Sequence, residues 1–475
     1  MKKILIAVLL LLSICMSMVG MTSCGGAKAQ PNFEVPEGGY DGSAVTITFY
    51  TTMGTNLTPV LETYIAEFNK LYPNITVVYE SVGGYDDVRD QIKTEITVGN
   101  QPNIAYCYPD HVALYNLAGA VATLDNLIDS EIPVTLADGT TEILGLTEEQ
   151  KADFIKGFYE EGRQFGDGLM YTMPFSKSTE VLYYNKTFFD QYASEGLKVP
   201  TTWDELEAAC KFIKEKDPEA IPLGYDSESN WFITMCEQLG TDYTSATKVD
   251  GTNFLFDNPE NKEFVKKFNE WYQKGYLTTQ KIYGAYTSGL FVSQTGTRSY
   301  MSIGSSAGAT HQRPKKDADG NYPFEVGIAP IPQMDAENNP KVISQGPSVC
   351  IFKKDNPQEV IASWLFVKFL TTSTEFQAQF SMASGYVPVL KSVAENPVYK
   401  TFTDKADGYD YVAALSAKVC LEQEQYYYTS PAFNGSSKAR DEVGALLTKL
   451  LTEKNYDAAV DQAFKDAIDE CEYSQ

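Results

Sequence analysis

The chain has 475 residues, of which 43% are hydrophobic and 21% are charged, an ordinary composition for a folded globular protein. This length is too great for a single hydrophobic core and predicts two or three. The formal net charge of −25 excludes nucleic-acid binding by counterion release and adhesion of the folded surface to anionic lipid.

The first 24 residues have the order of an export signal. Lys2 and Lys3 give a positive start, Ile4 to Leu12 are uninterruptedly apolar, and small residues follow up to Cys24. This ending resembles the bacterial lipobox, with Met21 where leucine is usual. We therefore expect a signal peptide over 1–23 and lipidation of Cys24. The alternatives are a simple secretory signal and an uncleaved anchor helix. Lipidation predicts a protein anchored to the cell membrane on its extracellular or periplasmic side.

Residues 24–43 are predicted to form a flexible tether, because they are rich in glycine and proline and show no periodicity. No later segment is long and apolar enough to cross a bilayer. Six cysteines lie in the body and have no metal-binding spacing. Export permits disulfides, but the sequence does not pair these cysteines, and their apolar surroundings are typical of core residues.

The first half of the body alternates strand and helix patterns. Strands are predicted at 44–50, 75–79 and 103–108, with helices between them at 60–71 and 86–98. Such alternation predicts a parallel α/β sheet, in which ligands bind beyond the carboxyl ends of the strands. Polar and aromatic residues occupy those ends, among them Tyr50, Thr52, Tyr85, Asp86 and Tyr108.

Further elements continue this pattern. An aromatic strand is expected at 181–185, and a helix that Thr202 caps begins at Trp203, with Glu205 three residues beyond the cap. A helix at 264–272 and strands at 298–303 and 324–331 follow. Residues 357–370 are predicted to form an amphipathic helix, and 443–468 are also helical in pattern.

Several segments resemble, in this order, the family 1 extracellular solute-binding proteins of ABC importers. The segments are Phe68-Asn69-Lys70-Leu71-Tyr72-Pro73-Asn74-Ile75, Gly99-Asn100-Gln101-Pro102-Asn103, Met173-Pro174-Phe175, Leu182-Tyr183-Tyr184-Asn185-Lys186, Pro200-Thr201-Thr202-Trp203-Asp204-Glu205-Leu206 and Ser384-Gly385-Tyr386-Val387-Pro388-Val389. This family includes the maltose-binding and glycerol-3-phosphate-binding proteins. The resemblance covers nearly all of residues 44–470.

The resemblance implies an α/β fold of two discontinuous lobes that close over a solute in a central cleft. We expect lobe 1 to comprise 44–172 and 325–372, and lobe 2 to comprise 173–324 and 373–475. It also implies a small-molecule ligand, ABC permease subunits as partners and a monomer. No enzymatic activity, cofactor or metal is expected, and the membrane is contacted only through the N-terminal lipid.

Within the family, the chain looks most like the glycerol-3-phosphate-binding branch. By this resemblance the cleft positions are Tyr85, Asp86, Ser178, Trp231, Ser305, Ser306 and Tyr386. The branch carries an arginine in a glycine-bearing segment, where this chain has Phe433. An aromatic face suits a sugar ring, whereas loss of a bidentate anion clamp disfavours a phosphate ligand. We therefore expect a sugar or oligosaccharide. The alternatives are glycerol-3-phosphate, a glycerophosphodiester, or a secreted carbohydrate-active enzyme.

Other interpretations of single residues stay open. Trp231 could instead cap the helix that runs to Leu239, and Asp86 could serve only as a helix cap. Gly304 to Gly308 match a nucleophile elbow, but His311 follows too closely for the hydrolase order. Asp317 to Asn321 hint at a calcium loop, yet Ile328 stands where the bidentate glutamate belongs, so a solvated turn is favoured.

Overall fold

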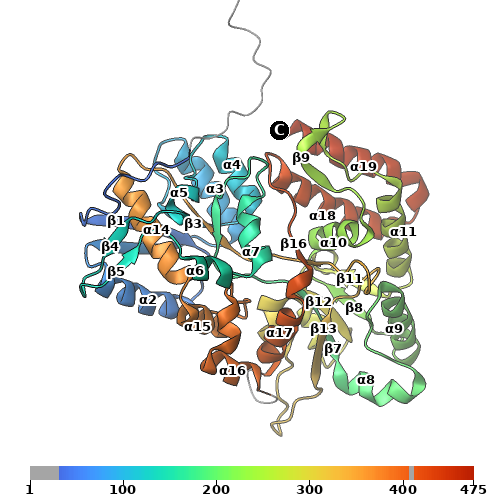
Figure 1. Cartoon of the computed structure of the whole chain (residues 1–475). Coiled ribbons are helices and arrows are strands. Elements are labelled where there is room, and N and C mark those ends of the chain that lie inside the picture. The colour runs from blue at the N-terminus through green and yellow to red at the C-terminus, as the bar shows by residue number, and fades with distance from the viewer. Residues whose placement is uncertain (1–31, 406–410, 475) are drawn as a thin grey trace, which may run out of the picture. The chain divides into compact units, whose positions relative to one another are not determined.

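The structure is a computed structural model, and it describes residues 32–405 and 411–474. The signal peptide and Cys24 lie outside the described residues. Residues 33–475 form one compact unit, which contains two five-stranded sheets. Figure 1 shows each sheet flanked by its own helices, and we call the two assemblies lobe 1 and lobe 2. No helix among the described residues is long and apolar enough to span a membrane.

The sheet of lobe 1 has the strand order β2-β1-β3-β15-β6. The first three strands run parallel, and β15 is antiparallel to both β3 and β6. The bounds are β1 Val45–Thr51, β2 Ile75–Ser81, β3 Ile104–Cys107, β6 Thr172–Pro174 and β15 Ser348–Ile351. Its helices are α2 Thr58–Leu71, α3 Tyr85–Ile96, α4 Pro109–Asn116, α5 Asp125–Ile128, α6 Glu148–Asp153, α7 Lys156–Glu160, α14 Pro357–Thr371 and α15 Thr374–Ser384.

The sheet of lobe 2 has the order β11-β8-β12-β7-β13, with β7 antiparallel to both of its neighbours. The bounds are β7 Glu180–Asn185, β8 Leu223–Tyr225, β11 Leu277–Thr279, β12 Met301–Ser305 and β13 Val326–Pro330. Its main helices are α8 Lys186–Tyr192, α9 Trp203–Lys216, α10 Glu228–Leu239, α11 Pro259–Gln273, α17 Tyr411–Glu422, α18 Ser436–Thr452 and α19 Tyr456–Tyr473. Shorter elements include the hairpin of β9 Thr244–Val249 with β10 Thr252–Phe254, and the helices α12 Gln280–Tyr283, α13 Ser288–Phe291 and α16 Pro397–Thr403.

The predicted alternation of strands and helices is confirmed. The Thr202 cap is present as well, since Thr202 Oγ1 accepts a hydrogen bond from Glu205 N at 3.2 Å. The helix at 357–370 differs from its prediction, because α14 is buried on nearly every side and not along one stripe. It lies between the lobe 1 sheet and other helices, and its Trp364 Nε1 donates to Leu144 O at 2.8 Å.

Two of the predicted lobe boundaries are wrong. Residues 325–347 were assigned to lobe 1, but β13 pairs with β7 in the sheet of lobe 2, so the chain returns only between β13 and β15. Residues from 373 on were assigned to lobe 2, yet α15 packs against α2 and α14 of lobe 1. The last crossing therefore falls between α15 and α17. The first crossing, at residues 175–179, lies close to its prediction.

The three crossings are joined by backbone hydrogen bonds. Lys177 N donates to Val387 O at 3.0 Å, and Ser178 N donates to Gln345 O at 2.7 Å. Beside them, the short strands β14 (Val342–Ile343) and β16 (Tyr427–Tyr428) pair in parallel. These contacts place the junction of the two lobes at a definite position in the sequence.

The predicted tether is partly wrong, because residues 33–43 pack on lobe 1. Phe33 and Tyr40 contact its hydrophobic core, and Phe33 N donates to Thr123 Oγ1 at 2.8 Å. Gln358 on α14 holds both Gly39 O and Asp41 N, each at 3.0 Å. Burial of aromatic rings and long-range hydrogen bonds fix this segment despite its glycines.

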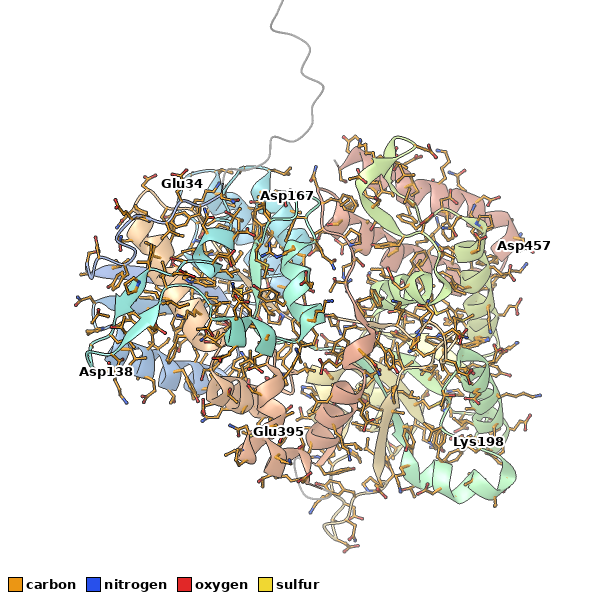
Figure 2. All side chains as sticks on the ribbon, viewed as in Figure 1. Glu34, Asp138, Asp167, Lys198, Glu395 and Asp457 are labelled. Carbon is orange, nitrogen blue, oxygen red and sulfur yellow. The ribbon has the colours of Figure 1, made fainter. Side chains whose placement is uncertain are left out.

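The body cysteines lie in the interior of the protein and many acidic side chains lie on its surface. The six body cysteines are all buried with free thiols: Cys107, Cys210, Cys236, Cys350, Cys420 and Cys471. Acidic side chains such as Asp138, Asp167 and Asp457 are exposed at the periphery (Figure 2). Because such carboxylates are solvated, they account for the net charge without pointing to a ligand.

Candidate ligand-binding cleft

Two adjoining cavities open at the junction of the lobes. The large cavity, of about 570 Å³, is lined by lobe 2 and the second crossing, with Glu180, Asp226, Asn230, Tyr286, Ser305 and Gln312 among its residues. The small cavity, of about 80 Å³, is lined by both lobes, with Tyr108, Asp110 and Glu161 facing Tyr243, Ser344 and Ser430. Gln345 and Arg440 line both cavities, so they mark the passage between them.

Two carboxyl groups face the large cavity, of which Glu180 is buried and Asp226 is half-buried. Glu180 begins β7 and accepts hydrogen bonds from Tyr225 Oη at 2.6 Å and from Asn230 Nδ2 at 2.9 Å. Its burial raises the pKa to about 7. Burial also raises the pKa of Asp226, although Thr287 donates to it through both N and Oγ1, at 2.6 and 2.7 Å. With a pKa of about 7, the Glu180 carboxyl can therefore donate as well as accept a hydrogen bond near neutral pH.

Asn230 connects the groups at the passage. It lies in the first turn of α10, where Ser227 Oγ accepts from Asn230 N and caps the helix. Its Nδ2 also donates to Gln345 Oε1 at 2.8 Å, and Arg440 donates to its Oδ1. One amide thereby orients a glutamine from the second crossing and an arginine from α18 toward the same space.

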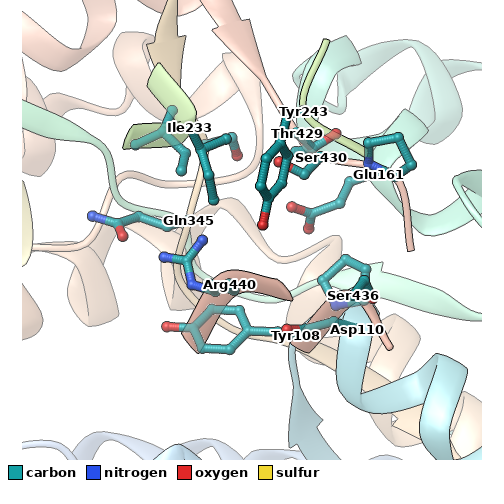
Figure 3. Close-up of a pocket in the computed structure, with 14 residues that line it drawn as sticks. Tyr108, Asp110, Glu161, Ile233, Tyr243, Gln345, Thr429, Ser430, Ser436 and Arg440 are labelled. Atoms are coloured by element: carbon teal, nitrogen blue, oxygen red, sulfur yellow. The ribbon is translucent and has the colours of Figure 1, made fainter. Parts of the chain in front are cut away.

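The small cavity is lined by charged side chains and by idle hydroxyls, by which we mean hydroxyls that have no hydrogen-bond partner among the described residues. Figure 3 shows Arg440 and the side chains of Tyr243 and Glu161 pointing into it, with Tyr108 on the opposite wall. The hydroxyls of Tyr243, Ser344 and Ser430 have no hydrogen-bond partner among the described residues. The carboxylate of Glu161, in contrast, is held by Lys177 Nζ and by Ser348 Oγ, the latter at 3.0 Å.

Tyrosines form the wall of lobe 1 next to the small cavity. The rings of Tyr85 and Tyr108 lie 4.7 Å apart between centroids, and Tyr106 stacks on Tyr85 at 6.5 Å. Tyr85 Oη and Tyr386 Oη are 3.0 Å apart, which joins α3 to the turn after α15. Burial raises the pKa of all four hydroxyls, so they remain protonated donors at neutral pH.

Four of the predicted site residues lie in or beside the cleft. Tyr108 lines the small cavity and Ser305 lines the large one, each at the carboxyl end of a strand. Tyr85 and Tyr386 adjoin Tyr108 through the tyrosine wall. This placement agrees with the rule that ligands bind beyond the strand ends of an open α/β sheet.

Five others line neither of these two cavities. Tyr50 turns away to donate to Glu95 at 3.1 Å, and Thr52 is half-buried beyond β1. Asp86 is 77% exposed and pairs with Arg89. Ser178 is buried in the first crossing, and Ser306 is buried with its Oγ accepting from Thr179 N at 3.2 Å.

Trp231 and Phe433 require correction, because both are core residues of lobe 2. Trp231 has no exposed surface and lies against Tyr225 at 4.7 Å and Phe268 at 4.2 Å. A stacking platform needs a free face, which Trp231 lacks. The alternative, that Trp231 caps the helix, is also wrong, because Ser227 caps α10 and Trp231 lies inside it. Phe433 is 9% exposed and packs against Phe254. Neither ring is available to a sugar.

The candidate nucleophile elbow and the candidate calcium loop lack the geometry that such sites require. A nucleophile elbow places its serine on a strained, exposed turn. Ser306 is 1% exposed, and Asp250 is the one non-glycine residue with positive φ among residues 32–405 and 411–474. Asp317 Oδ1 accepts from the backbone of Asp319 and Asn321, which is an ordinary polar turn. No cluster of three acidic, cysteine or histidine ligands occurs in the described part of the chain.

Comparison with known proteins decides the family. The profile of the bacterial extracellular solute-binding proteins matches residues 63–406, well over half of the chain. The chain belongs to this family. A maltotriose-binding protein from Pyrococcus abyssi is 23% identical over 363 residues, which cover 74% of this chain and 68% of that one.

Solved structures of solute-binding proteins share the fold. The cyclic α-maltosyl-1,6-maltose binding protein of Arthrobacter globiformis superposes with a TM-score of 0.67 at 20% identity, covering 91% of this chain and 99% of the other. UgpB from Mycobacterium tuberculosis, in complex with glycerophosphocholine, gives 0.69 at 18% identity, covering 91% and 98%. The two-lobed α/β fold expected for this solute-binding protein is therefore confirmed.

Sequence reasoning missed the groups that converge at the passage. Glu180 is an acid at the start of an apolar strand, and a buried charge there is a signal that could have been used. Asn230 lies one residue before Trp231, in the first turn of α10. Arg440 and Gln345 carry no local signal, because only the folded chain brings α18 and the second crossing together.

Proposed function

We propose that this protein captures a sugar or oligosaccharide in the cleft and delivers it to the permease of an ABC importer. The observation that carries the proposal is the set of donors and acceptors around the large cavity, with a wall of tyrosines beside the adjoining small cavity. Sugars need such groups for their hydroxyls and flat rings for their C–H faces. A cavity of about 570 Å³ falls within the usual size range of small-molecule sites.

Lobe closure is the proposed mechanism. The lobes are joined by three crossings, and a ligand that contacts both of them stabilises the closed arrangement by its differential affinity. The two lobes already contact at the edge of the cleft, where Arg89 Nη1 of α3 donates to Ser437 Oγ of α18 at 3.4 Å. Because this mechanism needs no covalent step, we expect binding without turnover.

Anchoring at Cys24 is part of the proposal. Family membership supports an extracellular or periplasmic location, and a lipid at Cys24 would keep a monomeric receptor next to its permease. Replacing Cys24 with serine should move the protein from the membrane fraction to the soluble one. Persistence of the Cys24→Ser variant in the membrane fraction would favour an uncleaved anchor helix.

Arg440 favours a second candidate, a glycerophosphodiester-binding protein. The sequence indicated that the arginine of the glycerol-3-phosphate branch was lost at Phe433, but the structure brings another guanidinium into the cleft from α18. A guanidinium is a good partner for a phosphate oxygen. Phosphate esters therefore belong in the same ligand screen as neutral sugars.

The test uses the chain from residue 25 on, which retains the whole compact unit. Thermal-shift screening against sugars, oligosaccharides, glycerol-3-phosphate and glycerophosphocholine is followed by calorimetry. We expect a sugar to raise the melting temperature, and Tyr108→Ala to weaken its binding at least about tenfold. Tyr283→Ala is the matched control, because Tyr283 is 45% exposed and lines neither cavity. If no sugar binds, the proposal is wrong; release of products would indicate an enzyme.

A further inference from the structure

We propose that the small cavity is a subsite for a carboxylate, so that the solute is an acidic sugar with a hexuronic acid residue at one end. This inference rests on the proposed function, since it assumes that a sugar occupies the large cavity. It adds an anionic group, carried by that sugar, at the passage marked by Arg440 and Gln345.

The first observation is that Arg440 has no carboxylate partner. Its hydrogen bond goes to the amide oxygen of Asn230, and no acidic side chain lies within ion-pair distance of its guanidinium among the described residues. Three other arginines each pair with aspartate: Arg89, Arg163 and Arg298. A guanidinium has five N–H donors in a planar fork, so most of this fork remains for a ligand.

The second observation is the set of idle hydroxyls around the same cavity. Tyr243 and Ser344 are each 6% exposed, and with Ser430 they lack partners among the described residues. Buried polar groups are nearly always paired, so three unpaired ones in one cavity indicate a polar guest. About 80 Å³ accommodates a few waters or one carboxylate, but no pyranose ring.

The positive charge of Arg440 acts on the tyrosine hydroxyls that line the small cavity. Burial raises the pKa of Tyr108 and of Tyr243, and the Arg440 guanidinium opposes that rise in both. The two tyrosines and the arginine therefore share one low-dielectric space, in which a charge-assisted hydrogen bond is stronger than in water.

The two acids of the small cavity select the type of anion. Glu161 is compensated by Lys177, which leaves Asp110 as the uncompensated carboxylate. A hexuronate carries one negative charge next to ring hydroxyls, so its carboxylate can meet Arg440 while a hydroxyl donates to Asp110. A phosphate monoester carries nearly two negative charges, so Asp110 would repel it more strongly than a hexuronate.

Arg440 is held in place for this role. Its partner Asn230 also donates to Glu180 and Gln345, at 2.9 and 2.8 Å, so a buried network fixes the guanidinium before any solute arrives. Because the guanidinium is already fixed, little side-chain entropy is lost when it binds an anion. Preorganisation of this kind makes the attraction for the anion more specific.

Calorimetry on the chain from residue 25 on compares glucuronate and galacturonate, free and at the end of oligosaccharides, with the corresponding neutral sugars. Glycerol-3-phosphate and glycerophosphocholine form the phosphate arm. We expect the acidic sugar to bind at least about tenfold more tightly than its neutral parent, as is typical of a charged hydrogen bond. Arg440→Gln should remove this preference, so that the acidic sugar and its neutral parent bind this variant with equal affinity. Arg298→Gln, which alters a surface ion pair with Asp217, is the matched control.

Tyr243→Phe provides a second variant that is independent of folding. It deletes a hydroxyl that has no partner among the described residues, so stability is retained while affinity for the acidic sugar falls about threefold or more. Equal affinity for acidic and neutral sugars overturns the inference and leaves the proposed function standing. Tighter binding of a phosphate ester than of any acidic sugar also overturns it. Absence of binding by every sugar defeats the proposed function itself.

Discussion

The buried pair of Lys177 and Glu161 joins the first crossing to lobe 1, and its removal has a calculable cost. Lys177 is fully buried and Glu161 is 3% exposed. Lys177 Nζ also donates to Gly346 O at 3.0 Å, so the ammonium binds the second crossing as well. Lys177→Met keeps the unbranched side chain as far as the Cε position but leaves the Glu161 carboxylate buried without its cation.

Breaking a buried pair on one side costs about 3–5 kcal/mol, because the remaining charge is uncompensated. The entropy of unfolding is about 2.1 cal/mol/K per residue, which for a unit as long as residues 33–475 corresponds to a shift of about 1 °C per kcal/mol. Lys177→Met should therefore lower the melting temperature by about 3–5 °C. The double variant Lys177→Met/Glu161→Gln removes both charges and should recover part of that loss.

Differential scanning calorimetry at pH 7 measures all of these variants. Lys186→Met is the matched control, because Lys186 is 37% exposed and its pairs with Asp190 and Glu325 are solvated. Such pairs contribute about 0–1 kcal/mol, so the control should melt within about 1 °C of the wild type. The reasoning is refuted if Lys177→Met behaves like the control, or if the double variant is no more stable than the single one.

Three further predictions follow from the placement of other groups. Trp231→Ala should cost about 3–5 kcal/mol in urea denaturation and leave solute affinity unchanged, because Trp231 is a core residue; weaker binding with intact stability would return it to the site. Glu180 has a folded pKa of about 7, above its unfolded value, so its stabilising contribution is lost as pH rises from 5 to 8. Relative to Glu180→Gln, wild-type stability should fall by up to about 3 kcal/mol over that range, and parallel pH profiles would contradict this. Limited proteolysis should spare residues 33–43, and rapid cleavage at Tyr40 would favour the tether that the sequence predicted.

Local patterns were sufficient to predict the elements but not the way in which they are shared between lobes. The sequence of β13 is apolar, which suits a buried strand of either sheet. It does not show whether β7 or a strand of lobe 1 is the neighbour of β13. Likewise, the sequence of α15 does not indicate which lobe this helix packs on. Pairing between distant strands is a tertiary property, so both boundaries depended on contacts outside the segments concerned.

The candidate site was predictable where chain geometry alone places a residue. Tyr108 and Ser305 end strands of the two sheets, and strand ends meet at the cleft in any open α/β sheet. The prediction for Trp231 was wrong because an aromatic residue beside a polar loop can turn inward, and here its ring packs against Tyr225 and Phe268. Exposure of a single aromatic ring is decided by its neighbours in space, which local sequence does not name.

Arg440 changes the expectation about the ligand more than any other residue. The sequence has a phenylalanine at the position where a related branch has arginine, and this missing arginine indicated a neutral solute. In the folded chain Phe433 is packed inside lobe 2, and a guanidinium from the second turn of α18 reaches the passage. A cation can thus be supplied to a cleft from a different position on the same lobe. Because charge in a cavity depends on the fold and not on one aligned position, the net −25 of the chain does not exclude an anionic ligand at a site where the Arg440 guanidinium has no carboxylate partner among the described residues.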